Sequence, residues 1–152
     1  MKVIKVDNIF NHVENEDVVC ITTNGNTRKD GGAVMGRGIA KQVSSKSPST
    51  QKLLGNYLTK YGNRCFNLGK YKVNNNVITL ASFPTKNNWN ENSSLELIKE
   101  SVKQITDMAN KFNWKRVYIP APGCGNGKLK WKDEVEPIVR NLDDRFIIMF
   151  QN

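Results

Sequence analysis

Two glycine-rich segments and one lysine are the features of this sequence that could carry chemistry. Five glycines lie between Asn24 and Gly38, immediately before a predicted helix. Exposed backbone N–H groups at a helix start, together with the helix dipole, favour a bound phosphate. An ordinary flexible turn is the alternative interpretation. A dinucleotide fingerprint is excluded, because Lys41 stands where the third glycine of that motif would be.

The second segment places Gly123, Gly125 and Gly127 directly after a predicted strand. Alternating glycines can fold into a nest of N–H groups that binds an anion. The segment is not a P-loop, because Leu129 follows Lys128 where that motif needs Ser or Thr. Two such loops without either standard nucleotide motif indicate a diphosphate held mainly by the backbone.

Lys86 follows a predicted buried strand, where its amine could be partly desolvated and lose its proton more easily. The alternative is a solvated surface lysine, one of many in this chain, and spacing alone favours that interpretation. Trp89, three residues later, could border a ligand, but packing in the core is the expected role of a tryptophan.

The cysteines do not indicate a disulfide framework or a metal site. The number of cysteines is odd, and the three, Cys20, Cys65 and Cys124, are widely spaced. The sequence has a single histidine, His12. We therefore expect a reducing compartment, no metal and no cofactor. A nucleophilic Cys124 would need an imidazole base, and nothing in the sequence links it to His12. A small residue tolerated in a tight loop is therefore the better interpretation of Cys124. A serine triad is also unsupported, because the sequence contains no G-x-S-x-G.

The net charge of +9 favours polyanionic partners such as nucleotides, nucleic acid or acidic protein surfaces. The alternative is a lysine-rich soluble surface, because the charges are scattered and not gathered into one basic run. No apolar run approaches the roughly 18 residues that span a membrane. The first residues interrupt their apolar pattern with charges, unlike a signal peptide, so we expect a cytoplasmic protein.

Segments with strand and helix patterns alternate along the chain. This order predicts an α/β sheet with helices on both faces, within one domain over residues 1–152. Ser93 and Glu96 resemble a capping box at the start of the clearest helix. The predicted strands are 2–6, 17–23, 65–73, 77–83, 116–120 and 145–150, and the predicted helices are 38–45, 48–61, 94–112 and 131–142, with Pro137 starting a new turn or a kink in the last.

Three loops follow directly after predicted strands: 24–38, 84–90 and 121–129. In α/β sheets, ligands bind outside the carboxyl ends of parallel strands. If these strands are parallel neighbours, the three loops open on the same face and form one site.

At these loops the sequence resembles the macrodomain family from end to end. The closest branch contains the terminal ADP-ribose glycohydrolase of eukaryotes and the DarG antitoxins of bacteria, which remove ADP-ribose from DNA. Met35 to Ala40 matches the M-G-x-G-I-A loop of that branch, and Phe83 to Lys86 matches the segment that holds its catalytic lysine. Gly123 to Trp131 matches its G-C-G-x-x-x-L-x-W loop. The short chain, rich in Lys and Asn, is also similar to compact macrodomain proteins of bacteriophages.

The resemblance implies a mixed, mostly parallel sheet and an ADP-ribose pocket with Lys86 as the catalytic residue. Asp7 would accept the adenine amino group, Phe150 would line the adenine pocket, and Asn24 or Asn26 would face the distal ribose. The two glycine-rich loops would enclose the diphosphate. The implied ligand-binding residues of these loops are Met35, Gly36, Arg37, Gly38, Ile39 and Ala40 in the first, and Pro122, Gly123, Cys124, Gly125, Asn126 and Gly127 in the second.

Two departures from the family pattern keep other activities open. The eukaryotic enzyme has an aspartate where this chain has Gly127, although the DNA-directed branch also carries glycine, and the longer asparagine–triple-glycine loop of other hydrolytic macrodomains is missing. The expected function is an ADP-ribosyl hydrolase acting on modified DNA or protein. The alternatives are an ADP-ribose 1″-phosphate phosphatase and a non-enzymatic module that binds ADP-ribose or a related signal nucleotide. We expect a monomer that binds ADP-ribose or an ADP-ribosylated macromolecule, nucleic acid included, without a membrane partner, in a bacterial host cytoplasm if phage-encoded.

Overall fold

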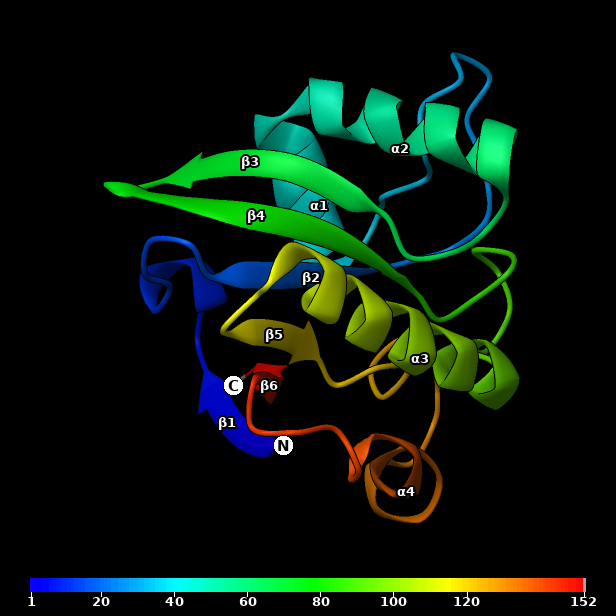
Figure 1. The fold of residues 1–152 in the computed structure, drawn as a ribbon. Helices are drawn as coiled ribbons and strands as arrows, with labels where there is room; N and C mark the ends of the chain where they lie inside the picture. The colour runs from blue at the N-terminus through cyan, green and yellow to red at the C-terminus, as the bar shows by residue number, and fades with distance from the viewer. Residues whose placement is uncertain (152) are drawn as a thin grey trace.

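The computed structural model describes residues 1–151, which form a six-stranded sheet flanked by helices (Figure 1). The strand order is β1-β6-β5-β2-β4-β3, and only the β3–β4 pair is antiparallel among the described strands. The predicted mixed, mostly parallel α/β sheet is therefore confirmed. The elements are β1 (Lys2–Val6), η1 (Ile9–Asn11), β2 (Val18–Thr23), α1 (Gly38–Lys46), α2 (Pro48–Tyr61), β3 (Asn67–Val73), β4 (Asn76–Pro84), α3 (Leu95–Phe112), β5 (Val117–Pro120), η2 (Trp131–Val135), α4 (Glu136–Val139) and β6 (Phe146–Gln151).

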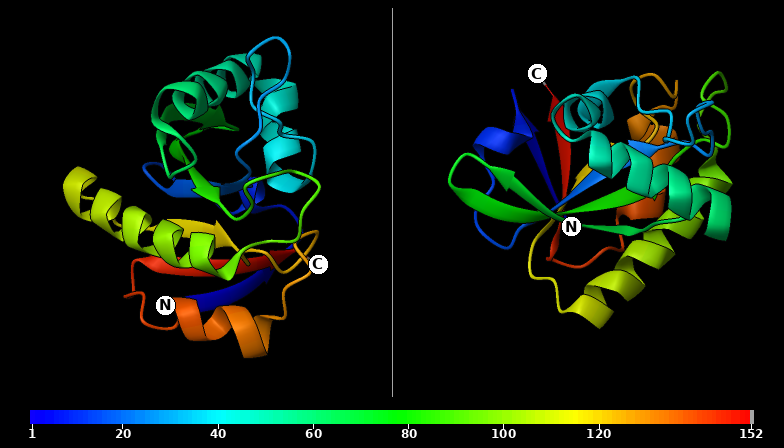
Figure 2. Two further views of the ribbon diagram at one scale, coloured as in Figure 1. Left: turned by 90° about the vertical axis from the view of Figure 1, so that its right-hand side faces the viewer. Right: turned by 90° about the horizontal axis from the view of Figure 1, so that it is seen from above.

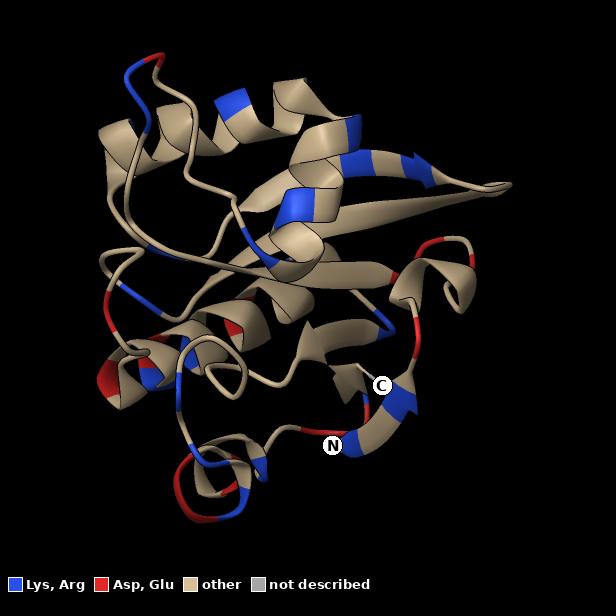
Figure 3. Cartoon of the chain, turned by 180° about the vertical axis from the view of Figure 1, so that it is seen from behind, with Lys and Arg blue, Asp and Glu red and all other residues tan. Residues whose placement is uncertain are grey.

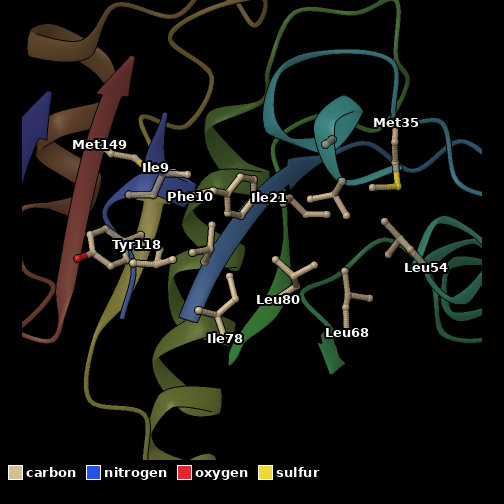
Figure 4. Packing of buried hydrophobic residues seen from close by; sticks show 14 of the residues in the cluster. Ile9, Phe10, Ile21, Met35, Leu54, Leu68, Ile78, Leu80, Tyr118 and Met149 are labelled. Carbon is tan, nitrogen blue, oxygen red and sulfur yellow. The ribbon is translucent and has the colours of Figure 1, made fainter. Parts of the chain in front are cut away.

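Two hydrophobic cores lie on the two faces of this sheet, and β2 is therefore buried on both sides. Val19 and Ile21 point into a core that α1 and α2 cover, and Figure 4 shows Ile21 with Leu80 and Leu54 in that core. Val18 and Cys20 point the other way, into a core covered by α3 and α4. In the view from above, α1 and α2 lie in front of the strands (Figure 2). Helices on both faces are thus confirmed.

The start of α3 differs from the predicted capping box. Ser94, not Ser93, is the N-cap, and its Oγ accepts a hydrogen bond from the backbone N–H of Leu97 at 3.2 Å. Because Leu97 occupies the third helical position, Glu96 cannot close a reciprocal box. The helix ends at Asn113, whose φ of 57° gives the left-handed C-cap that asparagine tolerates. Ser93 therefore precedes the N-cap and lies outside the helix.

Pro137 lies in the first turn of α4, where the helical hydrogen-bond pattern changes. The preceding turn, η2, is π-helical, so the segment predicted as one short helix is two pieces. Lys and Arg are spread over helices, strands and loops, as the sequence indicated (Figure 3). Within residues 1–151, no helix is both long and apolar enough to cross a membrane.

The strands β4, β2 and β5 are parallel neighbours, with β2 in the middle. Their carboxyl ends therefore point the same way, and the loops that follow them lie together at this end of the strands (Figure 1). This arrangement confirms the prediction that the three loops open on the same face.

Candidate functional site

A cleft of about 640 Å³ opens at the carboxyl ends of the strands. Its volume is typical of sites for small molecules and cofactors. It brings together most of the residues predicted from the sequence, from six separate parts of the chain. These are Asp7, Asn24, Met35, Gly36, Arg37, Gly38, Ile39, Ala40, Lys86, Gly123, Cys124, Gly125, Asn126, Gly127 and Phe150.

Two predicted site residues, Asn26 and Pro122, do not line this cleft. Asn26 supports a neighbouring loop: its Oδ1 accepts a hydrogen bond from the backbone N–H of Trp89 at 2.7 Å, and its Nδ2 donates to Asn88. Pro122 is buried at the start of the second glycine-rich loop. Asn24 reaches the cleft, but its amide also holds its own loop, by accepting from Asn26 N–H and donating to Val34.

The first glycine-rich loop delivers the N-terminus of α1 to the cleft. No side chain within residues 1–151 caps this helix start. The first helical hydrogen bond is donated by Lys41 to Arg37, so the N–H groups from Gly38 to Ala40 have no helical acceptor. Gly38 has a φ of 59°, a conformation that other residues rarely adopt. The helix start therefore presents unpaired donors and a positive dipole end to the cleft.

The second glycine-rich loop presents another set of donors. Gly123 turns the chain with a φ of 75°, and its carbonyl accepts from the N–H of Leu129 at 2.9 Å, which closes the loop. The N–H groups of Gly125, Asn126 and Gly127 donate to no acceptor in the described part of the chain. Two sets of unpaired N–H groups in one cleft suit a ligand with two linked phosphates.

Arg37 joins the two loops. Its Nη1 donates a hydrogen bond to the side-chain oxygen of Asn126 at 3.1 Å. Both residues line the cleft, so this guanidinium lies between the two sets of donors. A cation in this position adds to the attraction for an anionic ligand.

Lys86 brings an amine to the same place. Its Nζ donates to the backbone oxygen of Asn126 at 3.4 Å. Partial burial lowers the pKa of Lys86 below that of an ordinary lysine, and the positive charges of Arg37 and Lys128 lower it further. A lowered pKa makes the neutral amine of a lysine more available than it is in an ordinary lysine.

The loop that carries Lys86 is held by one side chain and by backbone hydrogen bonds to residues distant in sequence. Asn63 donates its amide to the carbonyl of Lys86 at 2.9 Å. The N–H of Gly25 donates to the carbonyl of Asn87 at 3.0 Å, and the N–H of Thr85 donates to the carbonyl of Thr23 at 3.0 Å. These bonds fix the backbone on both sides of the amine.

Trp89 lines the cleft with 57% of its surface exposed, so the predicted packing in the core is wrong. Its backbone is bound to Asn26, which keeps the loop turned outward. Within residues 1–151 the indole stacks on no other ring and on no cation. An exposed aromatic ring on a fixed loop at a cleft is suited to stack on a flat ligand group.

The part of the cleft next to β1 and β6 is more apolar. Val6, Ile9 and Met149 line it together with Asp7 and Phe150. The ring of Phe150 packs edge-on against Trp131, with centroids 5.1 Å apart, which fixes its orientation. A carboxylate beside apolar walls can accept a hydrogen bond from an aromatic base that packs there.

Cys124 is not an activated thiol. Burial raises its pKa to about 11, and the negative charge of Glu134 adds to that rise. All three cysteines are free, and residues 1–151 contain no cluster of His, Cys, Asp and Glu that could hold a metal ion.

Sequence comparison assigns this fold to a family, because residues 26–138 match the model of the Macro domain. The chain belongs to the macro domain family. Within this family, a protein of Mycobacterium tuberculosis named DNA ADP-ribosyl glycohydrolase is 29% identical over 115 residues, which cover 70% of this chain and 31% of that protein. A DNA ADP-ribosyl transferase–glycohydrolase fusion protein of Thermosipho africanus is 37% identical over 49 residues, 32% of this chain and 13% of that protein. The chain thus spans about a third or less of these relatives.

Solved macro domains share the fold. The macrodomain of Mycobacterium tuberculosis DarG superposes with a TM-score of 0.73 at 21% identity, over 99% of this chain and 97% of that one. Thermosipho africanus DarTG in complex with ADP-ribose superposes with a TM-score of 0.69 at 21% identity, over 87% of this chain and 37% of that one. These proteins therefore share the fold of this chain.

Sequence reasoning missed several residues of the cleft. Among them are two hydroxyl groups, Thr23 Oγ1 and Ser93 Oγ, which are buried and have no hydrogen-bond partner within residues 1–151. Both residues looked structural in sequence: Thr23 ends a buried strand and Ser93 fitted a cap pattern. Gln42 and Thr85 also line the cleft; Thr85 lies in the segment from Phe83 to Lys86, in which the sequence singles out Lys86 alone.

Proposed function

We propose that this chain binds ADP-ribose in the cleft and hydrolyses the bond that links it to a modified macromolecule. The observation that carries this proposal is the position of Lys86 beside two sets of unpaired N–H groups. The backbone donors would hold the diphosphate, with Arg37 between them. The adenine would then extend toward Asp7 and Phe150, and the distal ribose toward Lys86 and Asn24.

Lys86 would act as the nucleophile in this proposal. Its neutral amine attacks the anomeric carbon of the distal ribose, the bond from that carbon to the modified base or carboxylate breaks, and the leaving group takes the bonding electrons. The proton of the attacking amine passes to the leaving group. Water then replaces the lysine nitrogen on the anomeric carbon, which releases ADP-ribose and restores the amine. The lowered pKa of Lys86 increases the fraction of neutral amine available for the first step.

The names of the curated relatives support DNA as the macromolecule, since those proteins are DNA ADP-ribosyl glycohydrolases. The net charge of +9 is compatible with a nucleic-acid substrate. Protein carboxylates are the second class of substrate.

The deciding experiment offers three substrates to the protein and identifies the products by mass spectrometry. They are an ADP-ribosylated DNA oligonucleotide, a protein ADP-ribosylated on carboxylates, and ADP-ribose 1″-phosphate. Release of intact ADP-ribose from the first or second supports the proposal. Turnover of only the 1″-phosphate identifies a phosphatase.

Binding is measured separately, so that a module without activity is recognised. Free ADP-ribose should raise the melting temperature, with about 2.7 kcal/mol of stabilisation at roughly 100 times the dissociation constant. Binding without turnover of any of the three substrates identifies a binding module. The absence of both a melting shift and calorimetric heat at millimolar ADP-ribose would reject the proposal altogether.

A further inference from the structure

Ser93 has a buried hydroxyl that the fold leaves without a partner. The residue is only 8% exposed, yet it lines the cleft, and its Oγ has no hydrogen-bond partner within residues 1–151. An unpaired buried hydroxyl is destabilising, and native proteins retain few of them. Its retention at the wall of a cleft points to a partner that arrives with a ligand.

Other buried serines of this chain are bonded. Ser82 Oγ accepts from the N–H of Phe66 at 2.8 Å, and Ser101 Oγ donates to the carbonyl of Pro84 at 2.7 Å. Neither residue lines the cleft. The unpaired state of Ser93 is thus a property of its position and not of buried serines in this fold.

Ser93 and Lys86 bond to neighbouring carbonyls of one loop. The N–H of Ser93 donates to the carbonyl of Gly127 at 3.0 Å, and a Cβ on Gly127 would lie only 2.0 Å from Ser93 Oγ. The preceding carbonyl, that of Asn126, is the acceptor of the Lys86 amine. The hydroxyl and the amine therefore flank the same stretch of the second glycine-rich loop.

The same contact explains why residue 127 brings no side chain to the site. A Cβ there would also lie 2.6 Å from the carbonyl oxygen of Gly123, so the loop has no space for a carboxylate at this position without moving. The hydroxyl of Ser93 is a polar group beside residue 127 of the loop.

A sugar hydroxyl matches this group. Serine can both donate and accept, and a turn about its single side-chain torsion moves Oγ along the cleft wall. We infer that the Ser93 hydroxyl forms a hydrogen bond with a hydroxyl of the distal ribose, which makes Ser93 a specificity residue that distinguishes ADP-ribose from ADP. This inference rests on the proposed binding mode, which brings the distal ribose to Lys86, and not on hydrolysis.

The test compares the affinities of ADP-ribose and ADP for the wild type, Ser93→Ala and Ser82→Ala by calorimetry. Ser93→Ala should bind ADP-ribose roughly three- to tenfold more weakly than the wild type and should bind ADP equally well. Its melting temperature without ligand should be unchanged or higher, because the unpaired hydroxyl is gone. Ser82→Ala should melt at a lower temperature, since the N–H of Phe66 loses its acceptor, but it should keep the wild-type ratio of the two affinities.

A second measurement needs no variant. The wild type should bind at least one ADP-ribose analogue that lacks the 2″- or 3″-hydroxyl roughly three- to tenfold more weakly than ADP-ribose. Equal affinity for both analogues and ADP-ribose, or a wild-type affinity ratio in Ser93→Ala, overturns the inference and leaves the proposed function standing. An equal loss of affinity for ADP-ribose and for ADP in Ser93→Ala also overturns the inference. Failure of the wild type to bind ADP-ribose overturns the proposed function and this inference together.

Discussion

The side-chain amine of Lys86 lies 3.4 Å from the carbonyl oxygen of Asn126, in the second glycine-rich loop, which lines the cleft. If this amine is the nucleophile, Lys86→Ala should abolish the release of ADP-ribose from a modified substrate and spare the binding of free ADP-ribose. Lys86→Arg keeps the charge but cannot supply the same nucleophile, so it should be nearly as inactive. Reduction and peptide mass analysis of the wild type should trap an adduct on Lys86. Wild-type activity in both variants would show that Lys86 is an ordinary surface lysine.

The charge of Lys128 gives a prediction about pH. Lys128 lowers the pKa of Lys86, and only the neutral amine attacks, so the rate should rise with pH and level off below the pKa of an ordinary lysine. Lys128→Met removes a positive charge, which raises the pKa of Lys86 and reduces the neutral fraction at pH 7. The rising limb of the kcat profile should therefore move to higher pH. Lys60→Met, on α2 and outside the cleft, is the control and should leave the profile unchanged. A profile that does not move in Lys128→Met contradicts the role of the amine.

The general form of this site follows from the sequence, because buried strands and the glycines after them are local signals. Val18 to Ile21 predict a strand buried on both faces, and such strands in parallel order bring Lys86 and Gly125 to one edge. The family resemblance added the positions of Asp7 and Phe150, which both line the cleft.

The roles of Trp89 and Ser93 could not be predicted in the same way. The backbone N–H of the exposed Trp89 donates to Asn26, 63 residues earlier, and no local pattern reveals a contact of that range. Ser93 and Ser94 both fit a helix cap, and the choice between them depends on the chain turn that bonds Ser93 to Gly127. These are tertiary contacts that override local propensity.

The glycines of the two loops should respond differently to substitution. Gly125 has open space around its Cα and an ordinary φ, so Gly125→Val should fold normally and bind ADP-ribose much more weakly by blocking the approach of the diphosphate. Gly36→Val tests the first loop in the same way. Gly38→Val is a poor test, because the φ of 59° makes any side chain there strained. Circular dichroism confirms folding and calorimetry measures affinity; normal binding by both variants would mean that the loops are ordinary turns.

Gly127→Ala should instead destabilise the protein. Its Cβ would lie 2.0 Å from Ser93 Oγ and 2.6 Å from the carbonyl oxygen of Gly123, so the loop must shift. Backbone displacement of this kind typically costs about 1–3 kcal/mol. Thermal unfolding without ligand measures the loss, with Gly125→Ala as the control in open space. Equal melting temperatures for the two variants would show that the loop yields without cost.

Asp7 provides a test of where the adenine lies. Asp7→Ala should reduce the affinity for ADP-ribose much more than the affinity for ribose 5-phosphate, because only the former carries the base. Loss of a hydrogen bond to a charged acceptor costs about 1.5–3 kcal/mol. Calorimetry with the two ligands measures the difference. Equal losses for both ligands would place the base elsewhere in the cleft.

The exposed ring of Trp89 is expected to contact the modified macromolecule and not ADP-ribose itself. The indole is 57% exposed and shares the cleft wall with Lys86, so a flat group attached to the distal ribose could stack on it. Stacking of a base on an aromatic side chain contributes about 1–3 kcal/mol, so Trp89→Ala should lower kcat/KM on an ADP-ribosylated DNA oligonucleotide by roughly five- to 150-fold. Affinity for free ADP-ribose should be unchanged, because that ligand has no base beyond the distal ribose, and Trp89→Phe should retain most of the activity. Phe112→Ala removes an exposed aromatic ring at the far end of α3, outside the cleft, and controls for general effects of surface changes. If Trp89→Ala lowers turnover of a carboxylate-linked protein substrate by the same factor as turnover of DNA, the ring does not recognise a base; it then serves only to shape the cleft mouth.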